Sequence, residues 1–254
     1  MSNDPYTPPV SDLHDGGDNA EVHEPRVVDA SRGLAWFSES FNYFKMAPGP
    51  WILICVIGFL IMLALSLIPL LGSVSNILAP VWVAGLMLGC KALDDGKDLT
   101  LNHLFAGFGD KMGPLVIEGL IVTLMMIAVV LLVGALVFAV ILGDQGGFLS
   151  NFTTLGLTKI LLLVAVYLVL LLPIIAASWF APVLIVLGNK NVLDALKMSF
   201  NACMKNYLPF LVYGVVGLLL MIPVALTAGL AGLVVMPMLF ASVYISYKDI
   251  FVEG

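Results

Sequence analysis

Long stretches of the chain carry no charged residue, and the charges cluster between them. Uncharged runs of 45, 25, 30 and 42 residues separate Lys45 from Lys91, Glu118 from Asp144, Lys159 from Lys190, and Lys205 from Lys248. One membrane-spanning helix needs about 20 apolar residues. The two longer runs therefore predict two spans each and the two shorter runs one each, which gives six membrane-spanning helices.

Polar and Gly-containing breaks predict where the two longer runs turn back. We expect the first turn at residues 71–76 and the last near 222–227. The predicted spans are 50–70, 75–90, 115–142, 160–187, 207–224 and 227–247. The second is short for a bilayer, so we expect it to begin within the turn.

A second pattern precedes the first, third and fifth spans. Apolar residues recur there at the spacing of one helix face: Leu34, Phe37, Phe41 and Phe44; Leu101, Leu104 and Phe108; Leu193, Leu196, Phe200 and Cys203. Each series is followed by a basic residue and a proline. Such amphipathic helices are expected to lie along the headgroup plane, with Phe41, Phe108 and Phe200 as candidate interfacial anchors.

The even-numbered spans share a proline, at Pro80, Pro182 and Pro237. Proline removes a backbone hydrogen bond and kinks a helix, so neighbouring groups must satisfy the freed carbonyl. Trp82 and Trp179 lie beside two of these prolines, where they either line a groove between kinked spans or pack against the kink. These five residues are our candidate groove or kink residues.

The fold prediction is therefore an all-α polytopic membrane protein. Its six spans would form three repeats, each an interfacial amphipathic helix followed by a helical hairpin. The alternative is that three similar segments arose by coincidence. Gly85 and Gly89 add a face of small residues suited to close helix contact, with a partner in the same chain or in a second copy.

Composition agrees with a membrane protein. Apolar residues make up 61% of the chain and charged residues 11%, against about 25% in a soluble domain, and the mean hydropathy is +1.06. This excludes an ordinary soluble enzyme, a nucleic-acid binder and a disordered protein. The three cysteines are few and odd in number, so we expect free thiols.

The net charge of −6 belongs to residues 1–30, which hold seven acids and one base. This tail has almost no apolar periodicity, so we expect it to be disordered, cytoplasmic and dispensable for insertion. Residues 31–254 form the predicted membrane domain. Ten of the eleven Lys and Arg residues fall on one side of the six spans and only Lys159 on the other. The positive-inside rule then predicts that both termini are cytoplasmic.

The segment Asp194-Ala195-Leu196-Lys197-Met198-Ser199-Phe200, followed by Lys205-Asn206-Tyr207 and a new span, carries a family resemblance. It resembles bacterial six-helix inner-membrane proteins of unknown function. More distantly, it is similar to the membrane domain fused to some glycerophosphodiester phosphodiesterases. The resemblance covers about residues 31–250 and implies a multi-pass protein of the bacterial inner membrane. It brings no catalytic residues, and the hydrolase domain of those fused enzymes is not in this sequence.

Candidate chemistry is sparse. None of the three histidines lies within a predicted span, and we find no metal-ligand spacing, phosphate loop or nucleophile triad. We therefore expect no catalytic residue, no metal site and no cofactor. Glu118 is a candidate intramembrane acid, either functional or reaching back to the interface. Asp94, Asp95 and Asp98 form either a weak cation cluster or a solvated turn.

Three functions are compatible with this pattern. The first is a non-enzymatic protein that organises or assists other membrane components. The second is a small transporter or permease for a hydrophobic or lipid-like substrate, because repeats and broken helices are features that transporters use. The third, an enzyme, lacks catalytic groups. The expected partners are membrane lipids and either another membrane protein or a second copy, with no nucleic acid.

Overall fold

The structure is a computed structural model that describes residues 22–142 and 157–252. Within these ranges every regular element is a helix. In chain order the helices are α1 (Arg32–Met46), α2 (Pro48–Ser66), α3 (Pro69–Asp94), the 3₁₀ helix η1 (Leu101–Phe108), α4 (Met112–Leu142), α6 (Leu157–Ser178), α7 (Ala181–Val186), α8 (Val192–Lys205), α9 (Tyr207–Leu226), α10 (Gly232–Tyr247) and the π-helix η2 (Lys248–Val252).

Six helical stretches in the described part of the chain are long and apolar enough to cross a membrane. They are Pro48–Ser66, Val74–Asp94, Met112–Ala139, Lys159–Val186, Tyr207–Leu226 and Gly232–Val252. The fourth stretch includes both α6 and α7. The prediction of an all-α protein with six spans is confirmed, and each observed stretch overlaps a predicted one.

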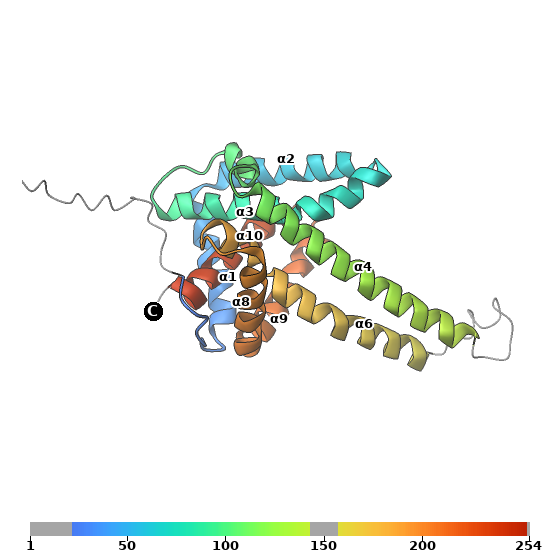
Figure 1. Cartoon of the computed structure of the whole chain (residues 1–254). Helices are drawn as coiled ribbons and strands as arrows, with labels where there is room; N and C mark the ends of the chain where they lie inside the picture. Colours follow the sequence, from blue (N-terminus) through green and yellow to red (C-terminus); the bar gives the residue numbers. More distant parts are fainter. Residues whose placement is uncertain (1–21, 143–156, 253–254) are drawn as a thin grey trace, which may run out of the picture.

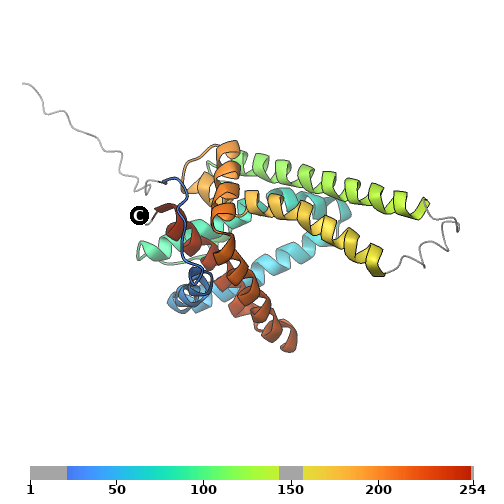
Figure 2. The ribbon, with the colours of Figure 1, turned by 90° about the horizontal axis from the view of Figure 1, so that it is seen from below.

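The spans extend away from the end of the molecule where α1, α8 and η2 lie (Figure 1). α1 and α8 run across that end, roughly perpendicular to α4 and α6. α4 and α6 lie side by side and project together from the rest of the molecule, which both views show (Figure 2). The first described residues lie near η2, because the amide of His23 donates to the carbonyl of Phe251 at 3.0 Å.

The first hairpin turns earlier than predicted. α2 ends at Ser66 and α3 begins at Pro69, so the whole of the expected turn at 71–76 is helical. Proline favours the first turn of a helix and holds the residue before it extended. Ile68 has this extended backbone, with φ −111° and ψ 109°. The part of α3 that is apolar enough to cross a membrane begins at Val74. The second span therefore begins within the predicted turn, as we expected from its short predicted length.

The last hairpin turns slightly later than predicted, because Pro223 lies inside α9. Thr227 closes the turn: its Oγ1 donates to the carbonyl of Pro223 at 2.7 Å and accepts from the amide of Ala231 at 2.9 Å. Gly229 follows with φ +95°, a left-handed conformation that favours glycine.

Pro182 accompanies a complete break between α6 and α7. Ser199 of α8 bridges this break, since its Oγ donates to the carbonyl of Ala176 at 2.6 Å and accepts from the amide of Phe180 at 2.9 Å. A neighbouring helix therefore supplies the hydrogen bonds that the break removes. Pro80 and Pro237, in contrast, lie inside continuous helices.

The amphipathic helices before the first and fifth spans are present as α1 and α8, but their buried faces differ from the predicted ones. α1 buries Gly33, Trp36, Phe37, Ser40 and Tyr43, and α8 buries Ala195, Leu196, Ser199, Ala202 and Cys203. Leu34 and Leu193, which opened the predicted apolar series, are 56% and 60% exposed. Close helix contact selects small side chains, which a hydropathy pattern ranks low.

The small-residue face of α3 contacts η1 of the same chain. A Cβ atom on Gly85 would lie 2.5 Å from the carbonyl oxygen of His103, and one on Gly107 would lie 1.9 Å from that of Val81. The two backbones therefore touch at this crossing. Of the two partners considered for this face, the structure shows the intramolecular one.

The three helices that precede a hairpin are α1, η1 and α8, and each packs on a hairpin other than the one that follows it. η1 packs on α3, α8 packs on α6 and α7, and α1 packs on α9 and α10. The hairpin contacted is always the previous one, and α1 contacts the last. This cyclic order is what a threefold repeat would produce, and the repeat itself stays a prediction.

Candidate functional site

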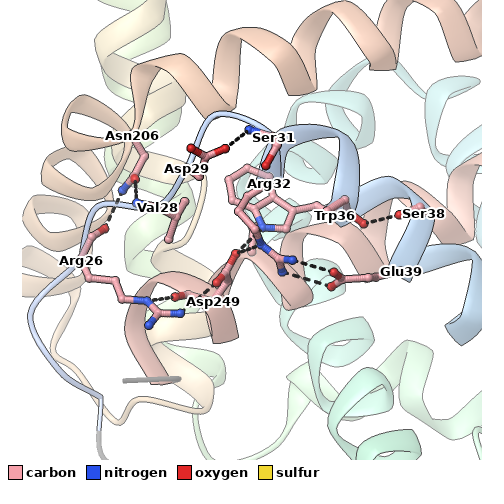
Figure 3. A network of polar contacts seen from close by, with 12 residues as sticks. Arg26, Val28, Asp29, Ser31, Arg32, Trp36, Ser38, Glu39, Asn206 and Asp249 are labelled. Carbon is pink, nitrogen blue, oxygen red and sulfur yellow. Dashed lines mark hydrogen bonds and ion pairs between the residues drawn. The ribbon is translucent and has the colours of Figure 1, made fainter.

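The end of the molecule near α1 and α8 holds a polar network centred on Asp249 of η2 (Figure 3). The Asp249 side chain is 7% exposed. Its Oδ2 accepts from Arg32 Nε at 2.5 Å and from Trp36 Nε1 at 2.9 Å, and its Oδ1 accepts from Arg26 Nη2 at 3.0 Å. Two guanidinium groups and one indole thus satisfy a single buried carboxylate, as buried charges require.

Arg32 extends this network along α1. Its Nη1 and Nη2 donate to the two carboxylate oxygens of Glu39 at 2.8 and 3.2 Å. Partial burial opposes the charge on Arg32, but the bonds with Glu39 and Asp249 outweigh it and raise the pKa of the guanidinium above its usual value. This network, which we call the clamp, ties α1 to η2.

Residues 22–30, which we call the strap, are bound to the body of the protein. Asn206 holds the strap on both sides: its Oδ1 accepts from the amide of Val28 at 2.8 Å, and its Nδ2 donates to the carbonyl of Arg26 at 2.9 Å. Lys205 Nζ donates to the carbonyl of Pro25 at 3.2 Å. The predicted tail of residues 1–30 therefore ends in a docked segment, and residues 1–21 lie outside the described part.

Asp94 joins three helices rather than forming part of a solvated turn. Its carboxylate accepts from Lys248 Nζ at 2.6 Å, from the Tyr244 hydroxyl at 3.1 Å and from the Tyr43 hydroxyl. These partners come from η2, from α10 and from α1, respectively. Asp94 is therefore a second structural contact at the same end of the molecule.

Asp95 and Asp98 do not join Asp94 in a cation site. Asp95 pairs with Lys91 at 3.1 Å and with Lys97 at 3.5 Å, and the hydrogen bond from Lys91 is the main cause that lowers its pKa. Asp98 is exposed. Among residues 22–142 and 157–252 no group of three His, Cys, Asp or Glu side chains could hold a metal ion.

Glu118 lies in α4 and is 1% exposed, so its side chain is enclosed by the protein. Neither carboxyl oxygen has a hydrogen-bond partner in the described part of the protein. The next residue is packed tightly, since a Cβ atom on Gly119 would lie 2.0 Å from the carbonyl oxygen of Ile77 in α3. A buried carboxyl without a partner is costly, and in a membrane span it is a functional candidate by default.

The two tryptophans beside prolines pack against aromatic rings. Trp82 meets Phe105 and Phe108 of η1 edge to face, with ring centroids 5.5 and 5.1 Å apart. Trp179 meets Phe210 and Tyr213 of α9 in the same way, at 5.8 and 5.6 Å. Packing therefore accounts for Trp179, whereas Trp82 also lines a pocket.

This pocket of about 310 Å³ lies between α2, α3, η1 and α10. Its floor is formed by Ile54, Leu86 and Leu104, which are 2–4% exposed. Met236, directly before Pro237, lies at its rim with Phe240. The lining side chains are apolar apart from the Trp82 indole N–H and the Cys55 thiol, so the pocket suits an apolar ligand. Trp82 thus lies in a hollow of the kind that one sequence interpretation expected.

The three candidate anchors differ in exposure. Phe41 is 41% exposed, and Lys45 Nζ lies 5.2 Å above its ring. Phe108 and Phe200 are half-buried and pack against the core. Their role as interfacial anchors stays a prediction.

Sequence reasoning missed Asp249, Asn206 and Ser199. Asp249 carried one signal, since it is an acid at the end of an apolar span, next to Lys248. Ser199 and Asn206 lie in the segment that carried the family resemblance, but their partners are 19 to 180 residues away. No local pattern identifies such pairs.

Comparisons with known proteins agree with the membrane architecture. A probable inner membrane protein of Burkholderia thailandensis is 30% identical over 257 residues, which cover 88% of this chain and 92% of that protein. No family model matches the chain. No solved structure matches it either.

Proposed function

The chain belongs to the family of the probable inner membrane protein of Burkholderia thailandensis, and from that premise we propose a non-enzymatic integral inner-membrane protein that organises or assists other membrane components. The cytoplasmic location of both termini is part of this proposal and rests on the distribution of Lys and Arg. That this chain is distantly similar to the membrane domain of glycerophosphodiester phosphodiesterases remains a hypothesis.

The observation that supports this role is the open hairpin of α4 and α6 (Figures 1 and 2). In the most apolar part of Met112–Ala139 no residue is buried. In the most apolar part of Lys159–Val186 only 17% of the residues are buried. Apart from the parts of α4 and α6 that pack on α3 and α8, this projecting hairpin of two long apolar helices is free to contact helices of another membrane protein or of a second copy.

Site-specific photo-crosslinking in the native membrane tests this role. A photoreactive amino acid at Leu131 in α4 or at Leu162 in α6 should give a discrete protein adduct, because both side chains are exposed on the hairpin. The same label at Leu218 in α9, which is also exposed, is the matched control and should give lipid adducts only. Lipid adducts alone at all three positions would contradict the proposal, and an adduct of twice the mass would identify a second copy as the partner.

A second candidate is a small transporter or permease for a hydrophobic or lipid-like substrate. The apolar pocket between α2, α3, η1 and α10 is the observation that favours it. Purification in lipid distinguishes the two candidates. A protein that co-purifies in fixed stoichiometry supports the first, whereas a bound lipid or small apolar molecule supports the second.

A further inference from the structure

The apolar pocket has a closed floor and an open rim. Ile54, Leu86 and Leu104 form the floor and are almost fully buried. The rim is formed by Phe59 and Met62 of α2 and by Met236 of α10, which are 66%, 38% and 42% exposed. The opening therefore faces sideways from the spans, toward the surroundings of α2 and α10.

The position of the opening determines which molecules can reach it. All the rim residues belong to stretches that are apolar enough to cross a membrane. The surroundings of such a stretch are lipid chains, and charged or strongly polar ligands are excluded from them. No charged side chain lines the pocket. A ligand must then be apolar where it touches the pocket and must already be dissolved in the bilayer.

A second, polar hollow lies where α2 begins and α3 ends. It is lined by Pro50 of α2, Leu93 of α3 and the loop residues Lys97 and Thr100, among others. Pro50 is one helical turn from Ile54, and Leu93 is about two turns from Leu86. The outer end of the apolar pocket thus carries an ammonium group, a hydroxyl and the Asp98 carboxylate, and this order of apolar and polar surfaces matches the division of a phospholipid into acyl chain and headgroup.

We propose that the apolar pocket binds one acyl chain of a bilayer phospholipid. The chain enters between α2 and α10 past Met62 and Met236, and its headgroup lies at the hollow beside Lys97. The methionines at the rim suit this role, because their flexible side chains adapt to irregular apolar surfaces. The proposal rests on the second candidate function, since it names the class of ligand that the pocket would take.

Gly58 offers a way to fill the pocket without disturbing the backbone. It lines the pocket, and a Cβ atom there would lie 3.8 Å from Leu104 Cδ1, an ordinary contact. Gly58→Leu should therefore occupy the space that the acyl chain would use. Gly214→Leu in α9 is the matched control, because nothing lies within 4 Å of a Cβ atom there.

The experiment uses the full chain in vesicles that contain a phospholipid with a photoreactive group on one acyl chain. Adducts should concentrate on pocket residues such as Cys55 and Met62. Gly58→Leu should reduce these adducts at least fivefold, whereas Gly214→Leu should leave them unchanged. Thermal unfolding of both variants checks their fold, and Met62→Trp at the rim replaces Gly58→Leu if that variant does not fold.

The possible outcomes separate the pocket from the function. Adducts spread evenly over all exposed spans, or unaffected by a folded pocket-filling variant, overturn the proposal. A labelled free fatty acid that gives the same adducts more efficiently than the phospholipid also overturns the choice of ligand. A lipid-transfer assay between vesicles completes the test. Pocket adducts without lipid transfer would support the acyl-chain site and reject the transporter function. Lipid transfer without pocket adducts would support the transporter function and reject the acyl-chain site.

Discussion

At the scale of single residues, Gly107 marks the closest approach between two backbones. A Cβ atom on Gly107 would lie 1.9 Å from the carbonyl oxygen of Val81, which cannot move as a flexible side chain can. We expect Gly107→Ala to lower the free energy of unfolding by about 3 kcal/mol, the upper range for overpacking.

The control for this prediction is Gly134→Ala in α4, where nothing lies within 4 Å of the added atom. Alanine favours a helix over glycine by about 1 kcal/mol, so this variant should be as stable as the parent or slightly more stable. Chemical or thermal unfolding in lipid nanodiscs measures both. Equal effects of the two substitutions would show that η1 and α3 do not touch as described.

Asp249 is the residue on which the clamp depends. Asp249→Asn keeps the shape of the side chain but leaves Arg26 and Arg32 without their buried counter-charge. Breaking a buried ion pair costs about 3–5 kcal/mol. The two arginine side chains are 42% and 30% exposed, and water compensates part of the loss. We therefore expect a loss of about 2 kcal/mol.

Glu39 provides the comparison, because it pairs with the same Arg32 but is 41% exposed. Glu39→Gln should cost less than about 1 kcal/mol, as exposed ion pairs do. Unfolding curves of the two variants under one condition decide the point. If Glu39→Gln is as harmful as Asp249→Asn, the burial of Asp249 does not determine the strength of the clamp.

At the scale of elements, the contacts of the strap argue against the expectation that residues 2–28 are dispensable, and a deletion tests it. Deletion of 2–28 removes Arg26 and the Val28 amide, together with their bonds to Asp249 and Asn206. We expect this deletion to destabilise the protein by about 2 kcal/mol, since each net hydrogen bond contributes about 0.5–1.5 kcal/mol.

Deletion of residues 2–21 leaves every described strap contact in place and should not change stability. Asn206→Ala keeps the whole strap but removes its side-chain bonds, so it should reproduce part of the effect of the longer deletion. Melting temperatures of the three variants test the strap. Identical values for the two deletions would mean that the strap contributes nothing.

α8 presents small residues to the protein and larger apolar residues outward, which sharpens the prediction for Phe200. Phe200 is half-buried and Asn201 is exposed. Full burial of an aromatic ring contributes about 1.5–3 kcal/mol, so we expect Phe200→Asp to cost about 1.5 kcal/mol and Asn201→Asp very little. Phe41 and Asn42 form the matching pair in α1. Stability measurements of the four variants in lipid would reject the anchor role if Phe and Asn substitutions behave alike.

At the scale of the whole molecule, α1, α8 and η2 lie at one end, and the turn between α2 and α3 lies away from that end (Figure 1). The Lys and Arg distribution predicts that the first end is cytoplasmic. Reporter fusions near residues 73, 150 and 225 should report an outside location, and fusions near residues 100 and 195 and at both termini an inside location; residue 150 lies outside the described residues. A reporter that works only in the periplasm and is active at residue 100 or 195 would reject this orientation.

The sequence predicted the six spans and the helical state of the segments before them, but not all of their contacts. The uncharged runs between Lys45 and Lys91 and between Lys205 and Lys248 determined the number of helices. The predicted position of the first turn, at residues 71–76, was wrong. The chain turns directly before Pro69, and the polar residues after it continue the helix. The pocket could be predicted only as a groove beside Trp82, because its floor comes from four separate elements.

By itself the sequence determined which segments enter the bilayer, because transfer of a helix from water to lipid depends on the composition of that one segment. The tertiary structure decided which faces meet. Lipid chains are as apolar as leucine, so association between spans depends on close packing of small residues and on polar pairs rather than on hydropathy. Gly33 against Pro209, Ser199 across the α6–α7 break, and Asp249 against Arg32, 217 residues away, are such contacts. Each joins segments that are distant in the chain, where no local pattern can indicate the partner.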